Sequence, residues 1–73
     1  MRPDEYPAMP PPQWSTNSWV YLAGKGIDRW VEVRGLVPAA RGQWGLFCAR
    51  DGDRWSVRVD PSEDLPTSLH RPD

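Results

Sequence analysis

The dipeptide Asp51-Gly52 constrains the fold most, because it predicts a tight turn between two strands. A type I′ turn needs positive φ at both central positions, which Asp and Gly tolerate better than most residues. Folding the flanking residues about this turn sets Trp44 opposite Val59. One face of the hairpin is then entirely apolar, with Cys48, Trp55, Leu46, Val57, Trp44 and Val59. Turn chemistry and alternation agree, so the sequence predicts a hairpin over residues 44–59.

Two earlier runs, residues 19–23 and 30–36, have the composition of strands. With Lys25-Gly26 as their loop, Val20 faces Val31 and Tyr21 faces Trp30 on the opposite side. Residues 36–43 are then expected to form a crossing loop. The predicted fold class is all-β, or β with one short helical turn. We expect a small antiparallel four-stranded sheet or an SH3-like barrel, although the aromatic peptide-groove motif of SH3 domains is absent.

The two ends of the chain differ from this β body, which spans residues 18–60. Residues 1–17 hold five prolines and are expected to be a flexible, extended Pro-rich arm, in which Trp14 is the one large side chain that would seek a surface. Asp60, Pro61 and Glu63 have the pattern of a helix start. Because Pro66 follows closely, residues 61–73 are expected to form one short helical turn and an acidic tail.

Size and composition exclude several classes of protein. A chain of 73 residues holds one domain. Cys48 is the only cysteine, so an intramolecular disulfide and a cysteine-based zinc site are both excluded and a reducing, cytoplasmic compartment is expected. The sequence shows no apolar segment long enough for a signal peptide or a membrane span. We therefore expect a monomeric protein without membrane contact.

Side chains that could perform catalysis lack partners. His70 is the only histidine and lies near the C-terminus, so neither a nucleophile–base pair nor a two-histidine metal site can form. Asp51 and Asp53 are residues typical of a turn, and Glu63 and Asp64 are typical of a helix start. Backbone conformation therefore explains these carboxylates without a catalytic role. No phosphate-binding loop is present, since Ala23-Gly24-Lys25-Gly26 has the wrong spacing. We expect no enzymatic activity, no cofactor and no metal.

The second face of the sheet is the predicted binding site. It would carry aromatic residues edged by arginines, namely Trp19, Tyr21, Trp30, Phe47, Arg34, Arg54 and Arg58. Trp, Tyr and Arg are enriched at interface hot spots, and they also suit stacking and phosphate contacts with single-stranded nucleic acid. A second possibility is that the arm folds over this face and Trp14 covers it as a second small core. The sequence leaves both possibilities open.

Five features of the whole chain are used for a comparison with known families. They are its length, the five Trp residues, the Pro-rich arm, the compact β body and the acidic tail. In these features the chain resembles the small RNA-polymerase-binding transcription regulators of lytic Xanthomonas bacteriophages. The resemblance covers the whole chain without a residue signature, so it assigns no site residue. It implies binding to host RNA polymerase near the N-terminal region of its largest subunit, inhibition of initiation at host promoters and read-through of terminators. The alternative is a small nucleic-acid-binding β module that uses the same Trp/Arg face.

Overall fold

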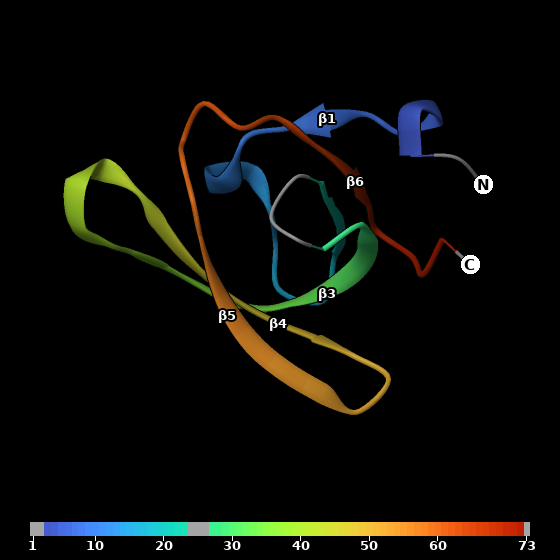
Figure 1. Cartoon of the computed structure of the whole chain (residues 1–73). Helices are drawn as coiled ribbons and strands as arrows, with labels where there is room; N and C mark the ends of the chain where they lie inside the picture. Colours follow the sequence, from blue (N-terminus) through green and yellow to red (C-terminus); the bar gives the residue numbers. More distant parts are fainter. Residues whose placement is uncertain (1–2, 24–26, 73) are drawn as a thin grey trace.

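In the computed structural model, which describes residues 3–23 and 27–72, six antiparallel strands form one sheet in the order β1-β6-β2-β3-β4-β5 (Figure 1). Three single 3-10 turns are the only helical elements in this part of the chain. The fold class is therefore all-β, as expected, with two more strands than the four that the sequence predicts. In chain order the elements are η1 (Pro3–Glu5), β1 (Ala8–Met9), η2 (Pro11–Gln13), β2 (Trp19–Leu22), β3 (Arg29–Pro38), η3 (Ala40–Gly42), β4 (Trp44–Arg50), β5 (Asp53–Val59) and β6 (Leu65–Ser68).

The β4–β5 hairpin has the predicted register, from Arg50 opposite Asp53 to Trp44 opposite Val59. Its turn is type I′, because φ is 50° at Asp51 and 88° at Gly52. The predicted apolar face packs on the core. Three of its six residues are buried, and the other three are partly buried against the same core cluster, with Leu46, Cys48 and Val59 in the first group and Trp44, Trp55 and Val57 in the second.

The β2–β3 pair also has the predicted register, with Val20 opposite Val31 and Tyr21 opposite Trp30. The proposed Lys25-Gly26 loop lies outside the described residues. The expected crossing loop over residues 36–43 is wrong, because β3 continues to Pro38 and pairs with β4 as far as Trp44. The alternation of β3 simply persists through this stretch after a bulge between Val33 and Gly35, and the connection shrinks to residues 39–43.

The segment expected to be a flexible arm is folded onto the sheet. Two 3-10 turns accommodate its prolines, and the two-residue strand β1 pairs with β6. Trp14 belongs to the core, and its Nε1 donates a hydrogen bond to the backbone oxygen of Met9 at 2.9 Å. Short edge strands and 3-10 turns do not need the backbone N–H that proline lacks, so a Pro-rich stretch can be ordered by a buried indole.

The expected helical turn and tail after Val59 are also replaced by other structure. Asp60 and Glu63 do exchange hydrogen bonds, since the Asp60 N–H donates to Glu63 Oε2 at 2.6 Å and the Glu63 N–H to Asp60 O at 3.0 Å. These bonds close a turn without starting a helix. The chain continues into β6, which lies between β1 and β2. Both ends of the chain are therefore part of the same sheet.

The core lies on one face of the curved sheet. Its fully buried members come from strands β2 to β5, as Val20 and Leu22, Val31 and Val33, Leu46 and Cys48, and Val59. Trp14 and Leu65, from outside the β2–β5 meander, complete the cluster. No helix among the described residues is long and apolar enough to cross a membrane.

Candidate interaction surface

The seven residues of the predicted binding face divide into a covered part and an open part. Trp19 and Trp30, on β2 and β3, are only 9% and 6% exposed. The side chain of Tyr21, on β2, is half-buried. Phe47, by contrast, is 50% exposed, and the three arginines at positions 34, 54 and 58 are exposed as well. The sequence left open whether this face is exposed for binding or covered as a second small core. The part with Trp19, Tyr21 and Trp30 is covered, and the part with Phe47 and the three arginines is exposed.

The covered half is closed by the two ends of the chain, but not by Trp14. The Tyr6 ring meets the Trp30 ring edge-on, with centroids 4.8 Å apart, and Tyr21 meets Trp30 from the other side at 5.6 Å. The guanidinium of Arg71 lies over the Trp19 ring at 5.1 Å from its centroid. Edge-on aromatic pairs and cation–π contacts of this kind each stabilise by about 1 kcal/mol. Trp19, Tyr21 and Trp30 thus form a second small core.

A shallow hollow beside the covered half is lined by four of the eight arginines. Its lining includes the side chains of Arg34, Arg50, Arg54 and Arg71 but only two carboxylates, Glu32 and Asp51. Arg34 Nη1 lies 3.0 Å from Glu32 Oε1, and Asp51 is shared by Arg50 at 3.4 Å and Arg71 at 3.1 Å. Positive charge is therefore in excess here, and Arg54 has no ion pair with any described residue.

The open half lies on the outer surface of β3, β4 and β5, and we call it the Phe47 face. Its members are Val37, Phe47, Arg54, Ser56 and Arg58, with Gly35 and Gly45 as its floor. The Phe47 ring lies over Gly35, since a Cβ on that glycine would meet Phe47 Cδ2 at 3.6 Å. Val37 covers Gly45 in the same way, with its Cγ2 at 3.4 Å. The two glycines leave a shallow, smooth surface from which one aromatic and one aliphatic side chain are accessible.

Arg54 and Arg58 border the Phe47 face along β5. Ala49 lies opposite Arg54, Phe47 opposite Ser56, and Gly45 opposite Arg58, so the two arginines flank in register the position that faces Phe47. Their Cα atoms are four residue steps apart, about 13 Å along β5. Neither arginine has an ion pair with a described residue. The face therefore offers an apolar centre with two cations at its rim that form no ion pair within the described part of the chain.

Sequence reasoning missed Val37 and Ser56 as members of this face. Val37 had been assigned to a crossing loop, and Ser56 carries no aromatic or charged group. The useful signal was the pair of glycines, because each lies directly opposite a large apolar residue that then stays exposed, Gly35 opposite Phe47 and Gly45 opposite Val37. Such pairs are a known device for supporting glycine in a sheet.

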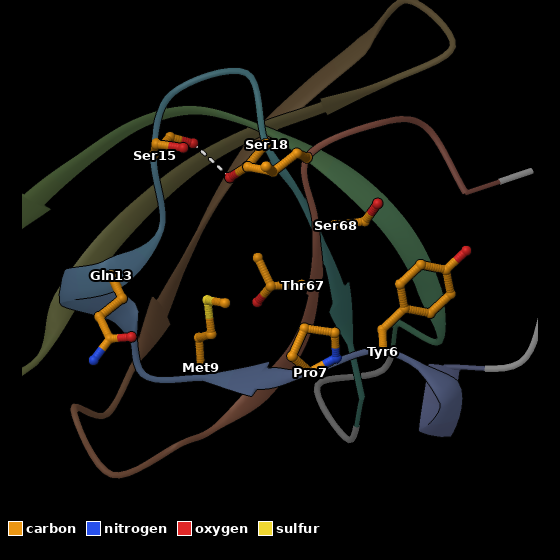
Figure 2. Close-up of a pocket in the computed structure, with 9 residues that line it drawn as sticks. Tyr6, Pro7, Met9, Gln13, Ser15, Ser18, Thr67 and Ser68 are labelled. Carbon is orange, nitrogen blue, oxygen red and sulfur yellow. Dashed lines mark hydrogen bonds between the residues drawn. The ribbon is translucent and has the colours of Figure 1, made fainter.

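Elsewhere, a hollow of about 320 Å³ lies between the N-terminal segment and β6 (Figure 2). It is at the small end of the ~300–1,000 Å³ range of ligand pockets. Three of its hydroxyl groups are already engaged, because Ser18 donates to Ser15 O at 2.5 Å, Thr67 to Leu65 O at 2.9 Å and Ser68 to His70 O at 2.6 Å. Their donor hydrogens are thus used within the fold, and the other lining side chains are mainly apolar.

Two further observations concern chemistry. Among residues 3–23 and 27–72, no three His, Cys, Asp or Glu side chains are grouped closely enough to hold a metal ion. Cys48 is buried in the core, and loss of water around the thiol raises its pKa to about 11. A thiol with such a pKa is a poor nucleophile at neutral pH.

Comparisons with protein-family models, with curated proteins and with solved structures found no match for this chain.

Proposed function

We propose that this protein is a non-enzymatic transcription regulator that binds host RNA polymerase through the Phe47 face, inhibiting initiation and promoting terminator read-through. One observation carries the binding proposal, namely that half-exposed Phe47 lies between two arginines without ion pairs among the described residues. Interface hot spots combine aromatic and arginine side chains in this way. The choice of polymerase rests on the resemblance in length, Trp content and charge distribution.

In this proposal the protein acts as a monomer in the cytoplasm of the host bacterium. Its second small core fixes the sheet, so that the Phe47 face is presented without rearrangement. A preformed surface loses little conformational entropy on binding, which favours a protein of this size as an inhibitor. The proposal needs neither a cofactor nor a metal.

Purified host RNA polymerase provides the direct test. The immobilised protein should bind the core enzyme or the holoenzyme. Adding the protein to a transcription reaction should lower the yield from a sigma-dependent promoter and raise the share of transcripts that pass a terminator. Phe47→Ala should reduce all three effects together. Leu69→Ala removes another exposed apolar side chain, 75% accessible, and should leave them unchanged. Absence of binding by the unaltered protein would sink the proposal.

The second candidate is a nucleic-acid-binding module, favoured by the same pair of arginines. Phosphate contacts release counterions, so affinity for a single strand falls with a log–log salt slope of about −0.7 for each phosphate neutralised. Two arginines predict a slope near −1.4 for an oligonucleotide. The net charge of −1 opposes this function, since it lowers non-specific attraction to a polyanion. Measuring binding of polymerase and of an oligonucleotide over the same salt range separates the two candidates.

A further inference from the structure

The edge of the sheet at β5 presents backbone groups that pair with no other described strand, beside the two arginines. We infer that β5 binds its partner by strand addition, taking up an extended, acidic segment of a protein. This inference deepens the proposed function, because it states how the Phe47 face and its edge are engaged. Among the described strands β5 pairs with β4 alone, and it is seven residues long, enough to form several inter-chain hydrogen bonds.

The hairpin register identifies the backbone groups that are free. In a hairpin with a two-residue turn, the pair next to the turn is hydrogen-bonded, and bonded and non-bonded pairs then alternate. Asp53, Trp55 and Val57 therefore direct their N–H and C=O groups toward β4. In agreement, Cys48 Sγ of β4 lies 3.6 Å from the Trp55 oxygen. The N–H and C=O groups of Arg54, Ser56 and Arg58 consequently point away from the sheet.

The same three residues carry the exposed side chains of the strand. An added strand that pairs with Arg54, Ser56 and Arg58 would place every second side chain of its own next to them. Acidic residues at the two outer positions would neutralise guanidinium groups that have no ion pair with described residues. A small or hydroxyl residue suits the central position beside Ser56. The charges therefore specify an acidic partner.

The inner side of the edge specifies apolar residues at the intervening positions. Leu46 and Cys48 of β4 are fully buried, whereas Trp55 and Val57 of β5 are only partly buried although they face the same core. An additional strand would cover this rim with its inward-facing side chains. The complementary segment thus alternates acidic or hydroxyl residues with apolar residues.

A second copy of this chain does not fit the edge. Antiparallel pairing of two β5 strands about Ser56 sets Arg54 of one copy opposite Arg58 of the other, and like charges in directly opposed positions destabilise a pair. Charged side chains on an edge strand commonly act against such self-association. The arginines therefore disfavour a homodimer and leave the edge available to an oppositely charged strand.

Synthetic peptides test the inference without knowledge of the natural segment. The probe is a fluorescent, end-blocked peptide with the core Glu-Val-Thr-Val-Glu, titrated with the full-length protein and followed by anisotropy. We expect saturable binding that is at least 10-fold weaker for the core Lys-Val-Thr-Val-Lys. N-methylation of the Glu and Thr residues removes the donors that face β5 and should abolish binding. N-methylation of the two valines, whose N–H groups face away, should be tolerated.

On the protein side, Ser56→Pro removes one outward N–H and no hydrogen bond to β4. It should weaken the acidic peptide by about 10-fold, the effect of losing roughly 1.4 kcal/mol, whereas Ser56→Ala keeps the N–H and should bind normally. Circular dichroism checks that both variants are folded. If Ser56→Pro does not fold, the two N-methylated peptides test the same bonds from the partner's side.

Each outcome has a definite meaning. No saturable binding of the acidic peptide, equal binding of the two N-methylated peptides, or equal binding of the Lys peptide would overturn the inference. So would an oligonucleotide that competes with the acidic peptide and binds Ser56→Pro as tightly as the unaltered protein, because the arginines would then serve nucleic acid. Normal polymerase binding by folded Ser56→Pro overturns strand addition and leaves the proposed function intact. Binding of the acidic peptide without binding of polymerase would support strand addition and overturn the proposed function.

Discussion

Trp30 and Phe47 lie on the same face of the sheet but have opposite roles. Trp30 is 6% exposed and held between Tyr6 and Tyr21, and its backbone oxygen accepts a hydrogen bond from Arg50 Nη1 at 2.8 Å. Phe47 is half-exposed and contacts the floor at Gly35. Single residues on this side of the sheet therefore belong either to the second small core or to the exposed Phe47 face.

This difference predicts unequal costs of truncation. Trp30→Ala should lower the free energy of unfolding by about 3–5 kcal/mol, because it leaves a cavity among aromatic rings. Phe47→Ala should cost less than about 1 kcal/mol, since little buried area is lost. Urea unfolding followed by far-ultraviolet circular dichroism gives both values. Equal costs at the two positions would show that the face is not divided as described.

Cys48 predicts a loss of stability at alkaline pH. Burial raises the pKa of its thiol from 9.0 to about 11, so above pH 9 the unfolded chain releases a proton that the folded chain retains. The stabilisation is complete below pH 9 and is lost as pH rises toward 11, by roughly 2–3 kcal/mol in total. The test compares urea midpoints between pH 8 and pH 11 for the unaltered protein and Cys48→Ala. Identical pH dependence in the two proteins would contradict this cause.

At the scale of the elements, local patterns predicted the hairpins and failed at the ends of the chain. Asp51-Gly52 and the flanking alternation specify the β4–β5 register completely. Strands β1 and β6 escaped prediction, because β1 has two residues and β6 contains Pro66, and neither shows an alternation that a single sequence can reveal. Their pairing depends on contacts between the two ends of the chain, which local sequence does not encode.

The β4–β5 turn predicts a backbone effect that is separate from packing. Gly52 has φ of 88° and nothing within 4 Å of the position of a Cβ, so Gly52→Ala should cost about 1–2 kcal/mol through the left-handed conformation alone. Gly45→Ala is the control, since its backbone is not left-handed and its Cβ would contact Val37 Cγ2 at 3.4 Å. Thermal unfolding should show a clearly larger loss at position 52. A reversed order would contradict the type I′ assignment.

At the scale of the whole molecule, the N-terminal segment is part of the fold. Pro7 O accepts a hydrogen bond from the Thr67 N–H at 2.9 Å, Met9 O accepts one from Trp14 Nε1, and Tyr6 covers Trp30. The five prolines of residues 1–17 are compatible with the two 3-10 turns and the two-residue strand found there. The contacts that order this segment are side-chain contacts with distant residues, so composition could not reveal them.

Deletion of residues 1–10 tests this role. Loss of the backbone acceptors of Pro7, Met9 and Pro10, one aromatic pair and strand β1 should lower the free energy of unfolding by roughly 2–4 kcal/mol. The Thr67 amide, now without its acceptor, should exchange its hydrogen faster. Urea unfolding and hydrogen exchange measure the two effects. An unchanged midpoint together with unchanged exchange would return the segment to the flexible arm that the sequence predicts.

The sequence could not show which residues of the predicted face are exposed, because exposure depends on which residues the two chain ends cover. All seven predicted residues lie on one side of the sheet, yet Trp19 and Trp30 are covered, and Val37 and Ser56 were missed. The account therefore places the partner's contact on Phe47 and the two arginines of β5. Two variants with the same change in net charge distinguish the loss of a specific contact on this surface from a general effect of net charge on binding.

The most direct test is an equilibrium titration of purified host RNA polymerase with Arg58→Glu and Arg41→Glu. Both arginines are exposed and without ion pairs among the described residues, and both substitutions change the net charge equally. Arg58 borders the Phe47 face, whereas Arg41 lies outside that face, in the loop between β3 and β4. The account predicts at least about 30-fold weaker binding for Arg58→Glu, as expected for loss of about 2 kcal/mol, and less than about 2-fold for Arg41→Glu. Equal effects of the two substitutions would contradict it.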